Sequence, residues 1–228
     1  MTRSTSARLA GSAYFFYMAV GLGNEALMHR ATDADGTAAI IARIAEHTTA
    51  LRLAILLKPC ECLAALVLAV ALYGITRDED HELATLGMIC RVAEGVFVAS
   101  FIPTDLGLLW LANVRAGVGA PDTATTNALS AFLLMPGGAI GAIFFALGST
   151  IFSYLLLRGR MVPSWLAQWG VFSSVLLVVG LPLQLAGFFT GPLTGYQWVP
   201  AIIFAPVLGL WLLVKGVAPL RVRETAGK

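Results

Sequence analysis

The chain has 228 residues, of which 58% are hydrophobic and 12% are charged, and its mean hydropathy is +0.81. Soluble domains carry about 25% charged residues, so this composition excludes an ordinary soluble globular protein. The formal net charge of only +2, without any run of lysine or arginine, excludes nucleic acid as a partner. We therefore expect a protein whose main surroundings are the lipid bilayer.

Long apolar runs account for this composition. A membrane-spanning helix needs about 20 predominantly apolar residues, and the chain supplies about six such runs. The sequence thus predicts an all-α, polytopic membrane bundle of six transmembrane helices, forming a single integral membrane domain over residues 1–228. The predicted spans are residues 8–28, 51–75, 84–111, 127–157, 164–189 and 196–217.

The segment between the first two spans predicts a short amphipathic helix. Ile40, Ile41 and Ile44 recur at helical spacing on one side of this segment, with Arg43 elsewhere. Such a helix lies at the membrane interface or packs as an extramembrane turn. In the second span, Pro59 removes one helical hydrogen bond, so we expect a kink there.

The fourth predicted span is broken by the sequence Met-Pro-Gly-Gly at residues 135–138. Beyond the break, small residues repeat at every fourth position, at Gly138, Ala142, Ala146 and Thr150. Small residues at that spacing let a neighbouring helix approach closely. We predict a helix-packing face at Gly138, Ala142 and Ala146, which is a candidate contact for a membrane partner or a second copy of the chain.

The distribution of basic residues predicts the orientation. The apolar run at the N-terminus lacks a cleavage site, so we expect a retained first span and, with six spans, both termini on one side. That side holds about nine basic residues and the other about four, which places both termini in the cytoplasm. The cytoplasmic set is Arg3, Arg8, Arg77, Arg158, Arg160, Lys215, Arg221, Arg223 and Lys228, and the other set is Arg30, Arg43, Arg52 and Arg115.

Seven charged residues within the first three predicted spans form a candidate cluster. At about 100° per residue, three of them in the third span lie within an arc of about 60° on one helix face. If the second and third spans are antiparallel neighbours, Lys58 and Glu61 lie close in depth to Arg91 and Glu94. The candidate cluster is Glu25, Arg52, Lys58, Glu61, Arg91, Glu94 and Asp105.

Two interpretations of this cluster stay open. In the first, the charges neutralise one another and hold the first three spans in register, because buried ion pairs often specify arrangement. In the second, they line a pocket that opens to the outer side and takes a small molecule or an ion, because ionisable residues inside a membrane commonly mark functional sites. Glu61 and Glu94 are then the candidate carriers of a proton or a cation.

Motifs for catalysis and for metal binding are missing from the sequence. It contains no HExxH, no nucleophile elbow and no glycine-rich phosphate loop. Cys60, Cys62 and Cys90 lie inside predicted spans and lack the spacing of a zinc site. We therefore expect no enzymatic activity, no metal and no cofactor.

Several stretches resemble a bacterial membrane family known as domain of unknown function 4386. They read RLAGSAYFFYMAVG, LRLAILL with ALYGITR, RVAEG, LGSTIFSYLLLRGRMVPSWLAQWG and LGLWLLVKG. The resemblance covers nearly the whole chain, and the segment that joins the fourth and fifth spans is its most specific part. It implies a six-span protein of the bacterial cytoplasmic (inner) membrane, and it implies no activity, substrate or site.

Overall fold

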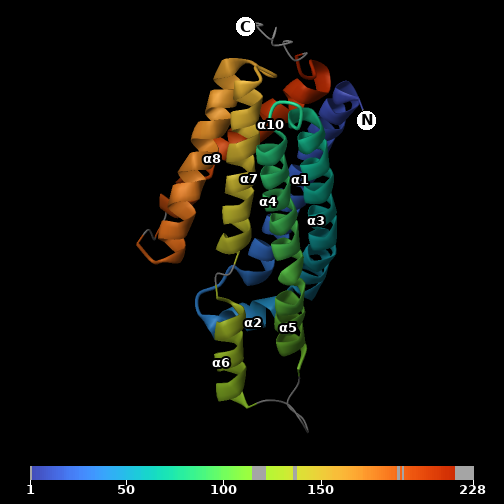
Figure 1. Ribbon diagram of the computed structural model, residues 1–228. Coiled ribbons are helices and arrows are strands. Elements are labelled where there is room, and N and C mark those ends of the chain that lie inside the picture. Colours follow the sequence, from blue (N-terminus) through green and yellow to red (C-terminus); the bar gives the residue numbers. More distant parts are fainter. Residues whose placement is uncertain (1, 115–121, 136–137, 189–190, 192, 219–228) are drawn as a thin grey trace, which may run out of the picture. The chain divides into compact units, whose positions relative to one another are not determined.

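The computed structural model describes residues 2–114, 122–135, 138–188, 191 and 193–218 (Figure 1). These residues form helices and contain no strand. The all-helical fold class predicted from the sequence is therefore confirmed. In chain order the helices are α1 (Arg3–Thr32), α2 (Thr37–Glu46), α3 (Thr48–Thr76), α4 (His81–Ser100), α5 (Ile102–Asn113), α6 (Thr123–Leu133), α7 (Ala139–Arg158), α8 (Ser164–Leu185), α9 (Leu193–Tyr196) and α10 (Val199–Val214).

Five helical segments in this described part of the chain are long and apolar enough to cross a membrane. They are Thr48–Thr76, His81–Asn113, Ala139–Arg158, Ser164–Leu185 and Thr194–Val214. The first predicted span, residues 8–28, falls in α1, which is long enough but less apolar, because Asn24, Glu25 and several glycines interrupt its hydrophobic run. A count of six spans therefore stays a prediction.

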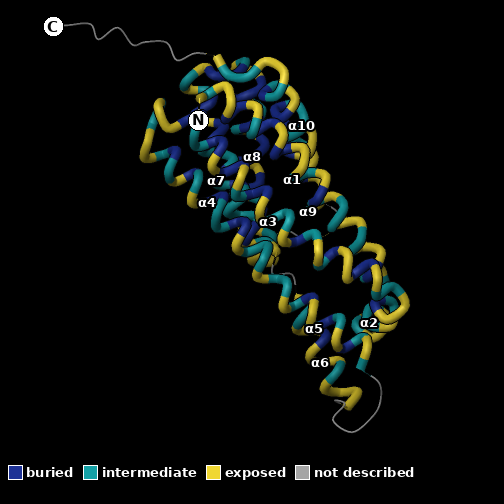
Figure 2. The backbone as a smooth tube through the Cα atoms, turned by 90° about the vertical axis from the view of Figure 1, so that its right-hand side faces the viewer, coloured by how far each residue is buried: buried dark blue, intermediate teal, exposed yellow. Residues whose placement is uncertain are grey.

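Large apolar side chains are exposed along these segments. In Figure 2, exposed positions recur along the helices. Examples are Leu56 on α3, Ile89 on α4, Phe172 on α8 and Leu210 on α10, each more than half exposed. Soluble monomers rarely expose so much apolar surface. In a bilayer these side chains contact hydrocarbon, which agrees with a membrane protein.

Contacts within the chain group its residues into two compact units, each of which is described by itself. Unit 1 comprises Met1–Phe16, Ala64–Glu94 and Ala139–Lys228. Unit 2 comprises Tyr17–Leu63 and Gly95–Gly138. The helices α1, α3 and α4 contribute residues to both units. The single membrane domain expected from the sequence stays a prediction.

In unit 1, α8 packs against both α7 and α10, and Figure 1 shows α7 and α8 side by side. Ala146 of α7 is fully buried against Leu177 and Leu181 of α8, and Ala142 packs against the same cluster. Two residues of the predicted packing face therefore contact helices of their own chain. The third, Gly138, precedes α7, and the space around it is open.

Helices α1 and α10 of unit 1 approach each other at Gly11 and Gly209. A Cβ atom at position 11 would lie 2.7 Å from the Gly209 carbonyl oxygen and 2.8 Å from the Leu213 backbone nitrogen. Such a contact with backbone cannot be relieved by a side-chain rotation. Glycine is thus required at position 11 by the proximity of the two helix backbones.

One end of unit 1 gathers the N-terminus and two interhelical loops. The Arg3 guanidinium donates to the Ile75 carbonyl oxygen at 2.8 Å and to the Met161 sulfur at 3.2 Å. Beside it, Arg158 pairs with Glu79 at 3.1 Å and with Asp80 at 3.0 Å. These contacts bring Arg3 and Arg158 to the same end, as the charge distribution predicts.

The Asp80 carboxylate of this end lies between backbone and guanidinium donors. The Leu83 backbone N–H and the Arg158 guanidinium hold the pKa of Asp80 below its usual range. A lowered pKa in the folded state means that the stabilisation is present at neutral pH and is lost as the pH falls through that lowered pKa. The contact therefore persists throughout the neutral range.

In unit 2, α2 packs against α5 and α6. Ile44 of α2 is fully buried beside Leu108 of α5, with Ile40 and Ile41 partly buried in the same cluster. The short amphipathic helix predicted between the first two spans is therefore α2, and its isoleucine face meets protein. The α6 helix begins at an N-cap, where the Asp122 carboxylate accepts a hydrogen bond from the Thr125 backbone N–H at 2.7 Å.

Two predicted spans are each divided into two helices. The third divides at Phe101 into α4 and α5, because Pro103 lies in the first turn of α5 and lacks an amide hydrogen. The fourth divides between Leu133 and Ala139, at the break expected from the sequence, although residues 136–137 lie outside the described residues. Only its second part, α7, is long enough to cross a membrane.

Replacing Gly11 with alanine should destabilise unit 1. Overpacking of a close contact typically costs about 1–3 kcal/mol, and here the added methyl meets backbone. Thermal unfolding of the purified protein measures the loss. Gly195→Ala is the matched control, because no atom lies within 4 Å of its Cβ position. Equal melting temperatures for the two variants would contradict the close approach of α1 and α10.

Candidate functional site

Lys58 of α3 and Asp105 of α5 form an ion pair in unit 2. Their side chains are only 11% and 5% exposed, and both residues lie in segments long and apolar enough to span a membrane. The Lys58 ammonium also lies over the Phe101 ring, 5.6 Å from its centroid. Lys58 therefore contacts α5 at the point where this helix begins, through one carboxylate and one aromatic face.

Glu61 lies one helical turn beyond Lys58 on α3 and has a different partner. Its carboxylate accepts a hydrogen bond from the Asn24 side chain of α1 at 3.3 Å. Gly21 of α1 leaves room for this carboxylate, because a Cβ atom there would lie 3.5 Å from Glu61 Oε1. Lys58 attracts Glu61 electrostatically but forms its ion pair with Asp105.

The Asn24–Glu61 pair leaves one acceptor oxygen without a donor. Asn24 Oδ1 is buried and has no hydrogen-bond partner among the described residues. Glu61 itself has no ion-pair partner there, since its bond with Asn24 is to a neutral amide. Two oxygen-bearing groups thus meet between α1 and α3 without a positive charge of their own.

In unit 1, Arg91 and Glu94 pair on one face of α4 at 2.7 Å, and each side chain is 2% exposed. The Arg91 guanidinium lies 4.8 Å from the centroid of the Phe145 ring of α7. The buried Tyr14 of α1 interacts electrostatically with both members of the pair. This arrangement holds a charged pair inside unit 1 with aromatic groups around it.

Gly148 of α7 provides the space for the Arg91 side chain. A Cβ atom at position 148 would lie 2.9 Å from Arg91 Cγ and 3.1 Å from the Gly87 carbonyl oxygen. The aliphatic part of the arginine therefore crosses α7 where a side chain is missing. This glycine lies outside the small-residue repeat identified in the sequence, so the repeat did not reveal it.

Two members of the predicted cluster, Glu25 and Arg52, are exposed. The buried positions of α3 around Arg52 are Leu51, Ala54 and Lys58, and a residue one position from Leu51 is rotated by about 100° to the outer face. In the same way, Glu25 is rotated away from Asn24, which faces α3. The expectation that Glu25 and Arg52 lie buried with the other charges is therefore not supported.

The remaining five predicted residues divide into two groups. Lys58, Glu61 and Asp105 belong to unit 2, whereas Arg91 and Glu94 belong to unit 1. The three charges expected on one helix face of the third span are all buried. A direct pairing of Lys58 or Glu61 with Arg91 or Glu94 stays a prediction.

Sequence reasoning missed the neutral and aromatic partners of these charges. Asn24 was overlooked beside the charged Glu25, although Gly21 one turn earlier marked the same helix face. Phe101 and Phe145 read as ordinary apolar residues, because a cation–π contact has no local sequence pattern. The neutral pair in which the Gln197 amide donates to Gln184 Oε1 at 2.7 Å was also missed, because its residues are 13 positions apart and share no local pattern.

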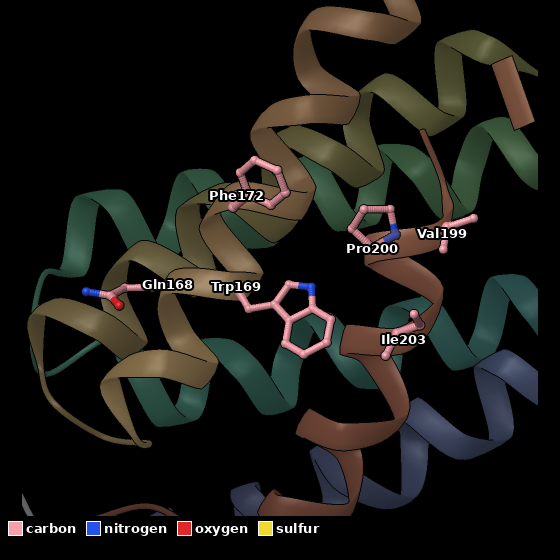
Figure 3. A pocket seen from close by; sticks show the side chains of 6 residues that line it. All are labelled: Gln168, Trp169, Phe172, Val199, Pro200 and Ile203. Atoms are coloured by element: carbon pink, nitrogen blue, oxygen red, sulfur yellow. The ribbon is translucent and has the colours of Figure 1, made fainter. Parts of the chain in front are cut away.

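Unit 1 also has shallow cavities, which are not formed by the charged residues described above. One, of about 530 Å³, is a groove between α8 and α10 (Figure 3), and another, of about 500 Å³, lies along α8. Their walls are almost entirely apolar, and no residue of the predicted charged cluster lines either one. Cys60, Cys62 and Cys90 form no disulfide, and the described residues contain no group of three or more metal-binding side chains.

A family model described as a domain of unknown function (DUF4386) matches residues 9–216. The chain belongs to this family. The resemblance seen in the sequence motifs is thus confirmed, and this member of the DUF4386 family is a helical membrane protein. No curated protein and no solved structure matches the chain. An assignment of function to this DUF4386 protein must therefore come from its geometry.

Breaking the Lys58–Asp105 pair should destabilise the protein. Asp105→Asn leaves the Lys58 ammonium buried without its counter-charge, which typically costs about 3–5 kcal/mol. Thermal unfolding in detergent measures this loss, and the double variant Lys58→Met/Asp105→Leu should recover most of it. Asp78→Asn is the matched control, because that carboxylate is exposed and 3.8 Å from Arg77. Equal unfolding temperatures for Asp105→Asn and Asp78→Asn would show that the pair contributes no stability.

Proposed function

We propose that this protein binds a proton or a small cation at Glu61, within its membrane-embedded helices, and transports or senses it without enzymatic chemistry. One observation carries the proposal. Of the three buried or half-buried acidic residues on the membrane-type helices, Glu94 and Asp105 pair with a basic side chain, whereas Glu61 meets only the neutral amide of Asn24. A carboxylate at such depth needs a positive charge or a proton.

The surroundings of Glu61 support this assignment. Asn24 Oδ1 lies buried without a donor, so it offers a second oxygen to a bound cation or to a protonated carboxyl group. Oxygen atoms of carboxylate and amide groups are the ligands that hard cations prefer. Gly21 leaves the carboxylate unobstructed on the α1 side.

The paired residues favour a second role, which is structural. Arg91 and Glu94 are each 2% exposed and form an ion pair on adjacent turns of one helix. Such pairs are costly to break and specify packing more than they add stability. We assign Arg91, Glu94, Lys58 and Asp105 to holding the helices in place, and only Glu61 to binding.

The proposal includes the topology expected from the sequence. The N-terminal Arg3 and Arg158, the last residue of α7, lie at the same end of unit 1, which supports an orientation with that end in the cytoplasm. The 30 residues of α1 would extend about 45 Å at 1.5 Å per residue, enough for a sixth span. Both termini would then face the cytoplasm of the inner membrane.

Neutralising Glu61 should abolish binding while leaving the fold intact. Glu61→Gln keeps an acceptor for the Asn24 amide and removes the charge. We expect the melting temperature of the wild-type protein to differ between pH 5 and pH 8, or between buffers that contain Na⁺, K⁺ or choline. The melting temperature of Glu61→Gln should not depend on these conditions. Proteoliposomes that contain a pH-sensitive or Na⁺-sensitive dye test whether binding leads to transport.

Unit 2 offers a matched control for Glu61→Gln. Glu46→Gln removes an exposed carboxylate of α2 in the same unit and should retain the wild-type ion dependence. If wild type and Glu61→Gln respond identically to pH and to each cation, and neither carries a flux above protein-free vesicles, Glu61 is not a binding residue. The charges of this chain would then serve its packing alone.

A further inference from the structure

Two apolar grooves lie on either side of Phe172 on α8. The first is completed by the start of α10, and in Figure 3 Trp169 and Phe172 lie across from Pro200 and Ile203. The second is completed by Leu157 of α7. Both grooves share Phe172 and Gln168, so that a single aromatic side chain separates them and a single amide lies in both walls.

The size and the lining of the grooves suit hydrocarbon. Their volumes of about 530 and 500 Å³ fall within the usual range of ligand clefts, about 300–1,000 Å³. Apart from Gln168, the second groove is lined by apolar side chains only, among them Val171, Val175 and Val179. Both lie on helices long and apolar enough to span a membrane, where the surrounding medium is lipid rather than water.

Polar and basic residues lie near one end of the grooves. Gln168 is four residues beyond Ser164, the first residue of α8, which is about 6 Å along the helix axis. Trp165, at the same end, is 54% exposed, as is common for tryptophan at a membrane interface. Leu157, which lines the second groove, directly precedes Arg158, the last residue of α7.

Arg160 provides the charge at this end. Arg158 is engaged with Glu79 and Asp80, whereas Arg160 is exposed and has no ion pair with any described residue. Arg160 also has a positive φ of 48°, which is uncommon for a residue other than glycine. A guanidinium at this position is suited to bind the phosphate of a lipid headgroup.

We propose that unit 1 binds one phospholipid with an anionic headgroup, its two acyl chains in the two grooves on either side of Phe172 and its phosphate at Arg160. Two separate grooves with one common amide match two chains on one headgroup. This site is separate from Glu61, and neither proposal depends on the other.

Native mass spectrometry of the delipidated protein tests the acyl-chain contact. The probes are phosphatidylglycerol and phosphatidylcholine with identical acyl chains. Ile203→Trp fills the first groove and should lower retention of phosphatidylglycerol roughly tenfold, the effect of losing one well-formed contact. Ile202→Trp is the matched control, because this neighbour is similarly exposed on α10 but does not line the groove.

A second pair of variants tests the headgroup contact. Arg160→Gln should remove the preference of the protein for phosphatidylglycerol over phosphatidylcholine. Arg77→Gln, which removes an exposed arginine of the loop between α3 and α4, should retain it. A variant whose melting temperature equals that of its control variant is taken to be folded. If Ile203→Trp does not fold, Phe172→Ala replaces it, because this substitution merges the two grooves at an exposed position.

Three results would overturn the proposal. Equal retention by Ile203→Trp and Ile202→Trp would show that no acyl chain occupies the groove. Equal retention of the two lipids by the wild-type protein would remove the role of Arg160. If Ile203→Trp instead changed the number of protein chains in the complex, the groove would be an interface with a second copy.

Discussion

The cost of an unpaired charge among apolar helices is the constraint on which this structure depends. Neither hydrocarbon nor apolar side chains can replace the water that such a charge loses. Arg91 therefore pairs with Glu94 one turn away on the same helix, and Lys58 pairs with Asp105 on another helix. The Lys58–Asp105 pair joins α3 to α5, whereas Arg91 reaches α7 through its contacts with Phe145 and Gly148.

Small residues make these arrangements sterically possible. Gly148 leaves the space that the Arg91 side chain crosses on α7, and Gly11 lets α1 meet the backbone of α10. Helices in a membrane gain little from the hydrophobic effect between them, so close packing and polar contacts must supply much of their association. The glycines and the ion pairs are therefore complementary parts of one packing solution.

The two proposed sites use opposite chemistry in the two units. In unit 2, Glu61 and Asn24 bring oxygen atoms together, and Glu61 forms no ion pair with any described residue. In unit 1, the grooves beside Phe172 are apolar, and no charged residue lines either of them. An ion and a lipid are thus drawn to different parts of the chain, so that binding of the two is separable by experiment.

The sequence by itself determined the helical class, the membrane character, the break near Gly138 and the short helix before α3, because these follow from local hydrophobicity and backbone chemistry. It also singled out five buried or half-buried charges. Only the tertiary structure decided their partners, for example Asn24 for Glu61 and Asp105 for Lys58. A partner depends on which helix faces meet, and that choice results from packing among residues far apart in the chain, which no local pattern records.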